Sequence, residues 1–181
     1  MKDNRYEIRL SGSGGQGLIL AGIILAEAAS IHEGKEAVQT QSYGPESRGG
    51  ASKSEVVISD TDIDYPKVTS PNLLLAMTQE ACNKHLGDLR EDGIAILDSC
   101  FVEDWKKAPN VIALPLTPIA KETTGRTIVA NIVALGAITA LSGIVSKESM
   151  EKAVLARVPK GTEEINLKAL NAGFEAAKKA L

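Results

Sequence analysis

The sequence predicts a single α/β domain of three layers, with a mostly parallel or mixed sheet between helices. The chain has 181 residues, which suits one domain, and 44% of them are hydrophobic although only 3% are aromatic. A core built from Ala, Val, Ile and Leu favours α/β layering over an aromatic-rich β-sandwich. Strand-like runs also alternate with helical stretches along the chain, which is the order typical of βαβ units.

Composition and charge exclude several classes of function. The formal net charge is −3 and no basic run occurs, so we expect no nucleic-acid partner. No apolar run approaches the roughly 20 residues of a membrane span, and the polar start of the chain leads directly into a strand, so we expect neither a membrane span nor a signal peptide. Two lone cysteines in an acidic α/β chain suggest a reducing cytoplasm. Cys82 and Cys100 lack Cys-x-x-Cys spacing, so we expect no metal or cluster held by this chain alone. His32 and His85 are expected on helix surfaces.

The first strand is expected over residues 6–10 and the first helix over residues 18–29, with the sequence SGSGGQG between them. Gly12, Gly14 and Gly17 fit the pattern G-x-G-x-x-G. A glycine-rich turn between a strand and a helix brings backbone N–H groups and a helix N-terminus up to an anion, usually a phosphate. The candidate binding residues are therefore Gly12, Ser13, Gly14, Gly15, Gln16 and Gly17.

Two other interpretations of this turn are open. A dinucleotide-binding module needs an acidic residue at the end of the second strand to hold a ribose. That strand is expected over residues 37–41, and no Asp or Glu follows Val38 in it, so a stand-alone nucleotide-binding module is the less favoured alternative. The glycines could also serve only tight packing of strand on helix, or contact with another subunit.

The next segment, residues 43–50 with the sequence YGPESRGG, is predicted to be a loop because it contains Pro45 and three glycines. It is longer than an ordinary connection and carries an aromatic residue, an acid and an arginine. Arg48 could hold a carboxylate or phosphate through two parallel hydrogen bonds, or pair locally with Glu46. The candidate interface or ligand residues here are Tyr43, Gly44, Glu46, Arg48, Gly49 and Gly50.

The rest of the chain completes the alternation. Further strands are expected over residues 52–59, 73–77, 93–98 and 111–116, and Pro115 marks the end of the last one as an edge or a turn. Further helices are expected over residues 78–86, 127–141, 147–157 and 162–180.

Two of the expected helices, residues 18–29 and 127–141, are apolar nearly all round. Such helices are buried on more than one face. One small domain is not expected to cover both, so we expect the isolated chain to self-associate through exposed apolar surface. Asn131 is the strongly polar residue of the second of these helices, and we expect it to be a buried hydrogen-bonding residue rather than a ligand.

Four segments together carry a resemblance to a known family. They are GSGGQG at residues 12–17, QSYGPESRGGASKSEVVISD at 41–60, ANIVALGAITALSG at 130–143 and NLKALNAG at 166–173. The chain resembles the gamma subunit, or gamma domain, of the 2-oxoacid:ferredoxin oxidoreductases over nearly its whole length. SYGPESRGG is the most specific part of these segments, and the sequence around it is most similar to that of the 2-oxoglutarate enzymes. Pyruvate, branched-chain 2-oxoacid and indolepyruvate enzymes are the alternatives.

The resemblance implies a reaction in which a 2-oxoacid is oxidatively decarboxylated, coenzyme A takes the acyl group, and electrons pass to ferredoxin or flavodoxin. It places thiamine diphosphate with Mg and the [4Fe-4S] clusters on the partner alpha, beta and ferredoxin-like delta subunits, so this chain is expected to be non-catalytic and inactive alone. The glycine-rich turn would then meet a phosphate of coenzyme A or the acidic terminus of a partner. The loop at residues 43–50 and Asn131 would contact partner subunits or coenzyme A. A purely structural subunit without a ligand is the other alternative.

Overall fold

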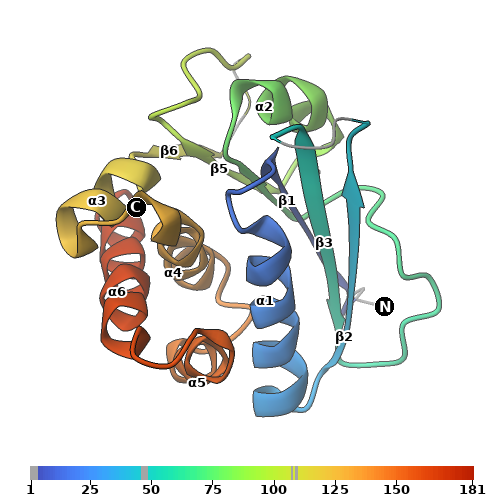
Figure 1. The fold of residues 1–181 in the computed structure, drawn as a ribbon. Helices are drawn as coiled ribbons and strands as arrows, with labels where there is room; N and C mark the ends of the chain where they lie inside the picture. Colours follow the sequence, from blue (N-terminus) through green and yellow to red (C-terminus); the bar gives the residue numbers. More distant parts are fainter. Residues whose placement is uncertain (1–3, 46–48, 107, 109) are drawn as a thin grey trace.

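The computed structural model describes residues 4–45, 49–106, 108 and 110–181 (Figure 1). Six strands form one sheet in the order β2-β3-β1-β4-β5-β6. β1 pairs antiparallel with β3 and parallel with β4, so the sheet is mixed, as predicted. The strands are β1 (Tyr6–Ser13), β2 (Glu36–Tyr43), β3 (Ala51–Ser59), β4 (Leu73–Ala76), β5 (Ile94–Asp98) and β6 (Val111–Leu114).

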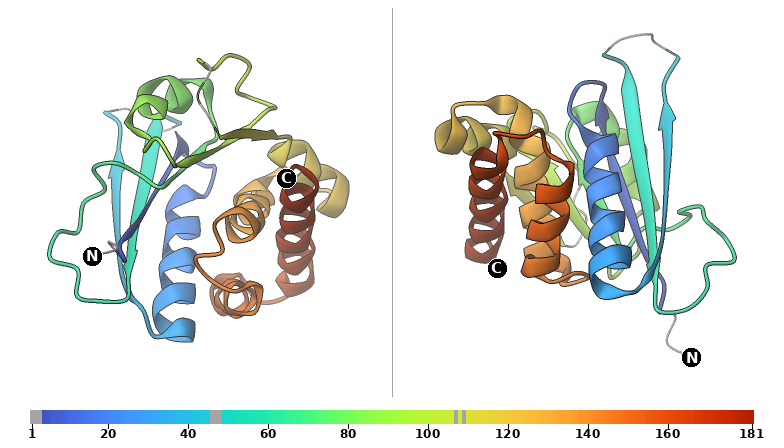
Figure 2. Two further views of the ribbon diagram at one scale, coloured as in Figure 1. Left: turned by 180° about the vertical axis from the view of Figure 1, so that it is seen from behind. Right: turned by 60° about the horizontal axis from the view of Figure 1, so that its bottom comes forward.

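Most helices lie on one face of this sheet, and one short helix lies on the other (Figures 1 and 2). On the first face α1 packs against the strands, α4 lies beside it, and α6 covers α4 from outside. On the second face α2 packs against β1 and β4, which completes the three layers. The helices are α1 (Leu18–Glu33), α2 (Gln79–His85), α3 (Leu116–Thr124), α4 (Ala130–Ser142), α5 (Lys147–Arg157) and α6 (Glu163–Lys179), with short 3₁₀ turns η1 (Leu86–Asp88) and η2 (Thr127–Val129).

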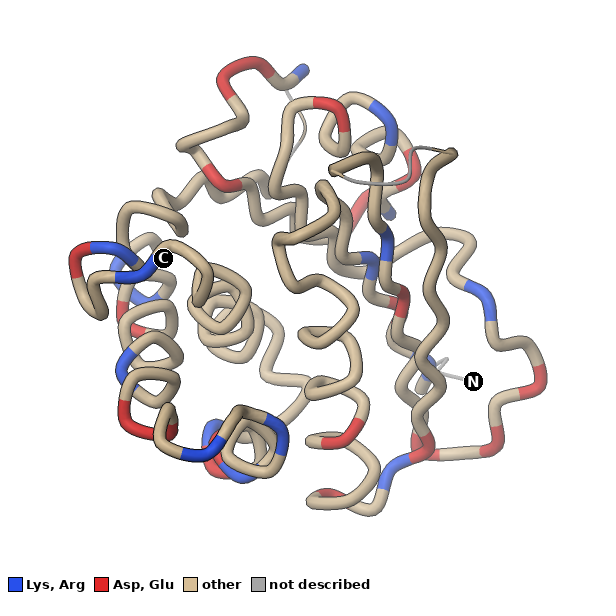
Figure 3. Tube along the Cα trace, viewed as in Figure 1, with Lys and Arg blue, Asp and Glu red and all other residues tan. Residues whose placement is uncertain are grey.

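The helical layer depends on an unusually close approach of α4 and α6. A Cβ atom on Gly136 would collide with the backbone carbonyl of Leu170, and one on Gly173 would collide with the carbonyl of Val133. Two of the segments that carry the family resemblance, at residues 130–143 and 166–173, therefore pack directly on each other. Figure 3 shows α4 free of charged residues inside this layer, whereas α5 and α6 carry Lys, Arg and Glu on the outside.

The second face of the sheet is buried too, and it is apolar over β4 and β5, where α2 packs, but polar over β1 and β3. Arg9 of β1 is 6% exposed and donates from Nε to Glu55 Oε2 at 3.0 Å and from Nη1 to Asp88 Oδ2 at 2.7 Å. The Glu7 carboxylate accepts hydrogen bonds from the backbone amides of Thr69 and Ser70, at 2.9 and 3.0 Å. The long connection between β3 and β4 thus covers this polar part of the face through hydrogen bonds rather than apolar contacts.

The structure corrects two predicted elements. The expected strand at residues 111–116 ends at Leu114, and Pro115 precedes the unpredicted helix α3, because proline suits the start of a helix better than the interior of a strand. The expected helix at 127–141 begins with the 3₁₀ turn η2, and its α-helical part starts only at Ala130. Asn131 therefore lies in the first turn of α4 and not in the middle of a helix.

The premise of self-association also changes. Residues 130–139 of α4 are all buried, so the domain covers this part of the second apolar helix by itself. Exposed apolar side chains lie at Ile31 and Ile128, which are 70% and 71% exposed.

None of the helices in the described part of the chain has the length and apolarity that crossing a membrane requires. Self-association of the isolated chain remains a prediction, and it is now based on the exposed side chains of Ile31 and Ile128.

Candidate functional site

The glycine-rich turn joins β1 to α1, and its shape depends on glycine at two kinds of position. Gly15 and Gly17 have φ angles of 89° and 72°, in the left-handed region that side chains disfavour. Gly12 has no room for a side chain, because a Cβ atom there would collide with Gln16, Leu18 and Met77. The turn is therefore held in one conformation by the packing around it.

Some backbone N–H groups of the glycine-rich turn, which the sequence predicted to bind an anion, donate instead to groups of the same chain. The amide of Ser13 donates to Gln16 Oε1 at 2.8 Å, and the amide of Gln16 donates to the carbonyl of Ser13 at 3.3 Å. The amide of Gly14 donates to the carbonyl of Gly50 at 2.7 Å. The Gln16 side chain also donates to the carbonyl of Met77 at 3.1 Å, which ties the turn to the end of β4.

The first turn of α1 keeps its donors open. Helix α1 starts after Gly17 with no side-chain cap and no acidic residue in its first turn, among the residues that the structure describes. The first backbone N–H groups of a helix have no partner within the helix, and the helix dipole adds a partial positive charge there. This end of α1 can therefore receive an anion through the amides that follow Gly17.

The glycine-rich turn and the β2–β3 hairpin lie side by side, which their sequences did not reveal. The Gly14–Gly50 hydrogen bond joins them, and a second bond from the Gly44 amide to the Ala51 carbonyl, at 2.7 Å, closes the base of the hairpin loop. Tyr43 is the last residue of β2 rather than a loop residue, and it is 64% exposed.

Two of the candidate loop residues, Glu46 and Arg48, lie outside the described residues. Gly49 borders that segment with a φ angle of 67°, so the described hairpin resumes in a conformation that favours glycine. The expected contacts of Glu46 and Arg48 therefore continue to depend on the sequence alone.

Asn131 supports the turn from the side of α4. It is 5% exposed, and its Nδ2 donates to the carbonyl of Gly17 at 3.1 Å. A side chain on Gly17 would collide with this amide group, so the two positions fit together. A contact of Asn131 with coenzyme A or a partner stays a proposal.

A groove of about 520 Å³ runs from the glycine-rich turn between α1, η2 and α6. One end of the groove is formed by Gly14, Gly15 and Gly17, next to the open first turn of α1. Its walls combine apolar side chains with a few polar ones, among them Ile19, Leu20, Ile128, Ile132, Val158, Ile165, Arg126, Asn131, Thr162 and Asn166. Such a groove suits a long ligand that has an anionic group at one end and an apolar arm.

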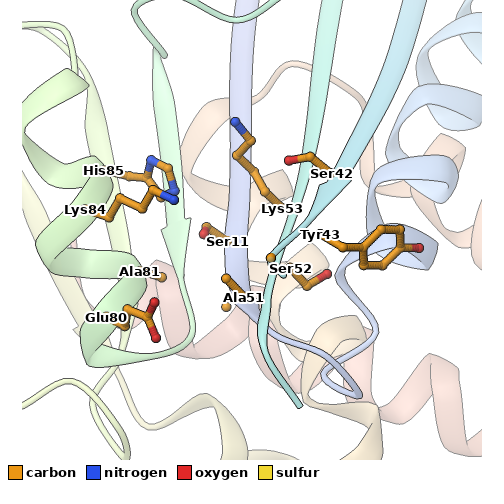
Figure 4. Close-up of a pocket in the computed structure, with 12 residues that line it drawn as sticks. Ser11, Ser42, Tyr43, Ala51, Ser52, Lys53, Glu80, Ala81, Lys84 and His85 are labelled. Atoms are coloured by element: carbon orange, nitrogen blue, oxygen red, sulfur yellow. The ribbon is translucent and has the colours of Figure 1, made fainter. Parts of the chain in front are cut away.

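A second, smaller pocket lies on the polar part of the sheet's second face, and it contains residues that the sequence analysis did not select. Figure 4 shows Lys84 and His85 pointing from α2 toward Lys53 of β3. His85 is 6% exposed and not at the surface as expected, because α2 packs this side chain against the sheet. The adjacent residues Lys84 and His85 can be read from the sequence as a candidate polar pair. No local pattern, however, indicates that they face Lys53 of β3, about 30 residues earlier in the chain.

Titratable groups outside this pocket offer little for catalysis or metal binding. Burial, and then the charge of Asp104, raises the pKa of the Cys82 thiol, whereas Cys100 is exposed. Within the described ranges no three His, Cys, Asp or Glu side chains converge as metal ligands.

Comparisons with known proteins agree on one family. The family described as pyruvate ferredoxin/flavodoxin oxidoreductase matches residues 7–176. The 2-oxoglutarate synthase subunit KorC of Methanocaldococcus jannaschii is 58% identical over 178 residues, which cover 96% of this chain and 95% of that protein. A segment of the ketoisovalerate oxidoreductase subunit VorA of Methanothermobacter marburgensis is 39% identical, covering 96% of this chain but 37% of the longer protein.

A solved structure extends the agreement to the fold. The crystal structure of the keto/oxoacid ferredoxin oxidoreductase gamma subunit from Geobacter sulfurreducens is 58% identical, with a TM-score of 0.90, and the match covers 97% of this chain and 98% of that one. The resemblance to gamma subunits that the sequence motifs indicated is thereby confirmed. The chain belongs to the pyruvate ferredoxin/flavodoxin oxidoreductase family.

Proposed function

We propose that this chain is the gamma subunit of a 2-oxoglutarate:ferredoxin oxidoreductase. The observation that carries the proposal is the nearly end-to-end match to a 2-oxoglutarate synthase subunit, at higher identity than the match to a ketoisovalerate enzyme. A branched-chain 2-oxoacid enzyme is the second candidate, because that ketoisovalerate subunit also matches almost all of this chain.

In the proposed reaction 2-oxoglutarate loses its carboxyl group as CO₂, the succinyl group passes to the thiol of coenzyme A, and two electrons leave to ferredoxin or flavodoxin. Thiamine diphosphate with Mg and [4Fe-4S] clusters, held by the alpha, beta and delta subunits, would supply the acyl and electron chemistry. This chain would then work in the cytoplasm as a non-catalytic subunit that is inactive alone.

The contribution proposed for this chain itself is a binding surface for coenzyme A in the groove beside the glycine-rich turn. A phosphate of the ligand would lie at the first turn of α1, near Gly15 and Gly17, where the open amides and the helix dipole favour an anion. The pantetheine arm would lie along the apolar wall that includes Ile19 and Ile132. An acidic segment of a partner subunit at the same amides is the alternative occupant.

Assembly tests the function. The purified chain alone should not reduce a viologen dye with 2-oxoglutarate and coenzyme A, and adding it to the other subunits should restore activity that they lack without it. Dye reduction by the chain alone would contradict a non-catalytic role, and full activity of the other subunits without it would contradict the proposed need for this subunit.

A matched pair of glycine variants tests the coenzyme A groove. Gly15 and Gly34 both have positive φ angles and open space around them, but they lie at opposite ends of α1, and only Gly15 lines the groove. Gly15→Ala and Gly34→Ala should each destabilise the chain by about 1–2 kcal/mol through left-handed strain. Only Gly15→Ala should raise the KM of the assembled enzyme for coenzyme A. Equal KM values for coenzyme A in the two variants would contradict coenzyme A binding in this groove. They would favour an acidic segment of a partner subunit as its occupant.

A further inference from the structure

The small pocket on the polar part of the sheet's second face lies between α2 and the ends of β1 and β3, and it adjoins the groove at Tyr43 and Ser52 (Figure 4). Its volume is about 80 Å³, which is room for a small ion or a few waters. The side chains that matter for its chemistry are Ser11, Lys53, Lys84, His85 and Glu80. These residues have no part in the groove proposed for coenzyme A.

His85 is the buried group that points to a ligand. Its side chain is more than nine-tenths buried and points into the pocket (Figure 4). Neither imidazole nitrogen has a hydrogen-bond partner among the described residues, because Asp88 Oδ2 lies 3.9 Å from Nδ1, beyond hydrogen-bond distance. No fully buried side-chain nitrogen or oxygen lacks a partner in that part of the chain, so the unpartnered imidazole nitrogens keep some accessible surface, and His85 lines the pocket.

The charges around the imidazole balance in number, three cations against three acids, but one lysine, Lys84, is left without an ion pair among the described residues. Lys53 Nζ lies 3.2 Å from Glu55 Oε1, but the other oxygen of Glu55 is already taken by Arg9. Arg9 also forms an ion pair with Asp88. Lys84, which lines the pocket, forms no ion pair with any described residue. Glu80, in the first turn of α2, is the acid that lines the pocket itself.

The protonation of His85 agrees with this charge distribution. Burial, together with the positive charges of Arg9, Lys53 and Lys84, lowers the pKa of His85 to about 4, and the negative charge of Asp88 opposes this only in part. The imidazole is therefore neutral at pH 7 and can donate one hydrogen bond. Together with two ammonium groups and the Ser11 hydroxyl, it forms a set of donors around a space of ionic size.

We propose that this pocket binds a phosphate group, held by Lys53, Lys84 and the imidazole of His85. Lysine ammonium groups bind phosphate through charge-assisted hydrogen bonds, which are stronger than neutral ones. The phosphate could be a free ion or part of a larger ligand, because Tyr43 and Ser52 line both this pocket and the groove. The site itself is independent of the coenzyme A groove, and only the second source depends on the proposed function.

Titration of the full chain with inorganic phosphate at pH 7 tests the site directly. The imidazole NMR signals of His85 should shift and saturate, while those of His32, the other histidine of the chain, serve as the internal reference. Lys53→Met and Lys84→Met should each weaken phosphate binding about tenfold or more, the effect of losing one charged hydrogen bond. Lys152→Met, at an exposed position on α5, is the matched control and should bind like the parent.

Coenzyme A and dephospho-coenzyme A distinguish the two sources. Tighter binding of coenzyme A by the parent, with the difference lost in Lys84→Met, would identify the 3′-phosphate of coenzyme A as the occupant. A saturable response to inorganic phosphate with equal binding of the two coenzymes would identify a free phosphate. The site is overturned if phosphate leaves the His85 signals unchanged, or if folded Lys53→Met and Lys84→Met chains, checked by circular dichroism, bind it as the parent does. The coenzyme A groove can fail its own test without affecting this result.

Discussion

The two faces of strand β1 are equally buried but are stabilised by different forces. Ile8 and Leu10 point toward the helical layer and have no exposed surface. Glu7 and Arg9, between and beside them, are 6% exposed on the opposite face, where their charges are paired or hydrogen-bonded. Burial alone therefore does not distinguish the apolar face of this strand from its polar face. The types of residue on each face, and the partners of their side chains, do distinguish them.

This difference determines how each face responds to change. The apolar face gains free energy from surface removed from water, which does not depend on pH. Ion pairs on the buried polar face contribute little net stability, yet removing one partner leaves a charge without compensation. The polar face should therefore be sensitive to pH and to charge deletion, whereas the apolar face should be sensitive to lost volume.

The largest expected effect is a cavity on the apolar face. Leu10→Ala should lower the free energy of unfolding by about 2–5 kcal/mol, because the packed side chains around it cannot close the space. Chemical denaturation at pH 7 and pH 5 should give the same loss. Ile31→Ala, at a 70% exposed position, is the control and should change stability by less than about 0.5 kcal/mol. A similar small loss for Leu10→Ala would show that this face is not the core.

A charge deletion on the polar face should come next. Arg9→Met should cost about 3 kcal/mol, because Glu55, 11% exposed, loses its best partner while Lys53 still compensates part of its charge. The matched control is Arg90→Met, which removes an exposed pair with Asp92 and should cost less than about 1 kcal/mol. If the two variants lose equal stability, the Arg9 network is not the buried pairing described above.

The smallest effect at neutral pH, and a distinctive one in acid, concerns His85. Its pKa is about 4 in the folded protein and about 6.5 when unfolded, so the unfolded chain binds more protons between these values. Stability should therefore fall as the pH falls from about 6.5, with a loss from this group of about 3 kcal/mol at pH 4. His85→Gln should remove that part of the pH dependence, and His32→Gln should retain it. Parallel pH profiles for the parent and His85→Gln would contradict the burial of a neutral imidazole.

The sequence predicted the layers, the mixed sheet and the glycine-rich turn because each depends on local signals such as alternation, apolar runs and glycine spacing. It missed α3, because Pro115 after a β-like run is compatible with either a strand end or a helix start. It also placed His85 on the surface, because a short polar helix gives no local sign that its last residue faces a sheet. The contact of Gly14 with Gly50, and the pocket formed by Lys53 and Lys84, bring together residues about 30 or more positions apart, which no local pattern encodes.

The most direct test of the central proposal is the substrate preference of the complex that assembles on this chain. The chain, carrying an affinity tag, should be purified together with its partner subunits, and the kcat/KM of coenzyme A-dependent dye reduction should be measured with 2-oxoglutarate, pyruvate and 2-oxoisovalerate. The proposal predicts the highest kcat/KM with 2-oxoglutarate and succinyl-coenzyme A as the product. A complex that prefers pyruvate or 2-oxoisovalerate, or a chain that recovers no partner subunit, would contradict it.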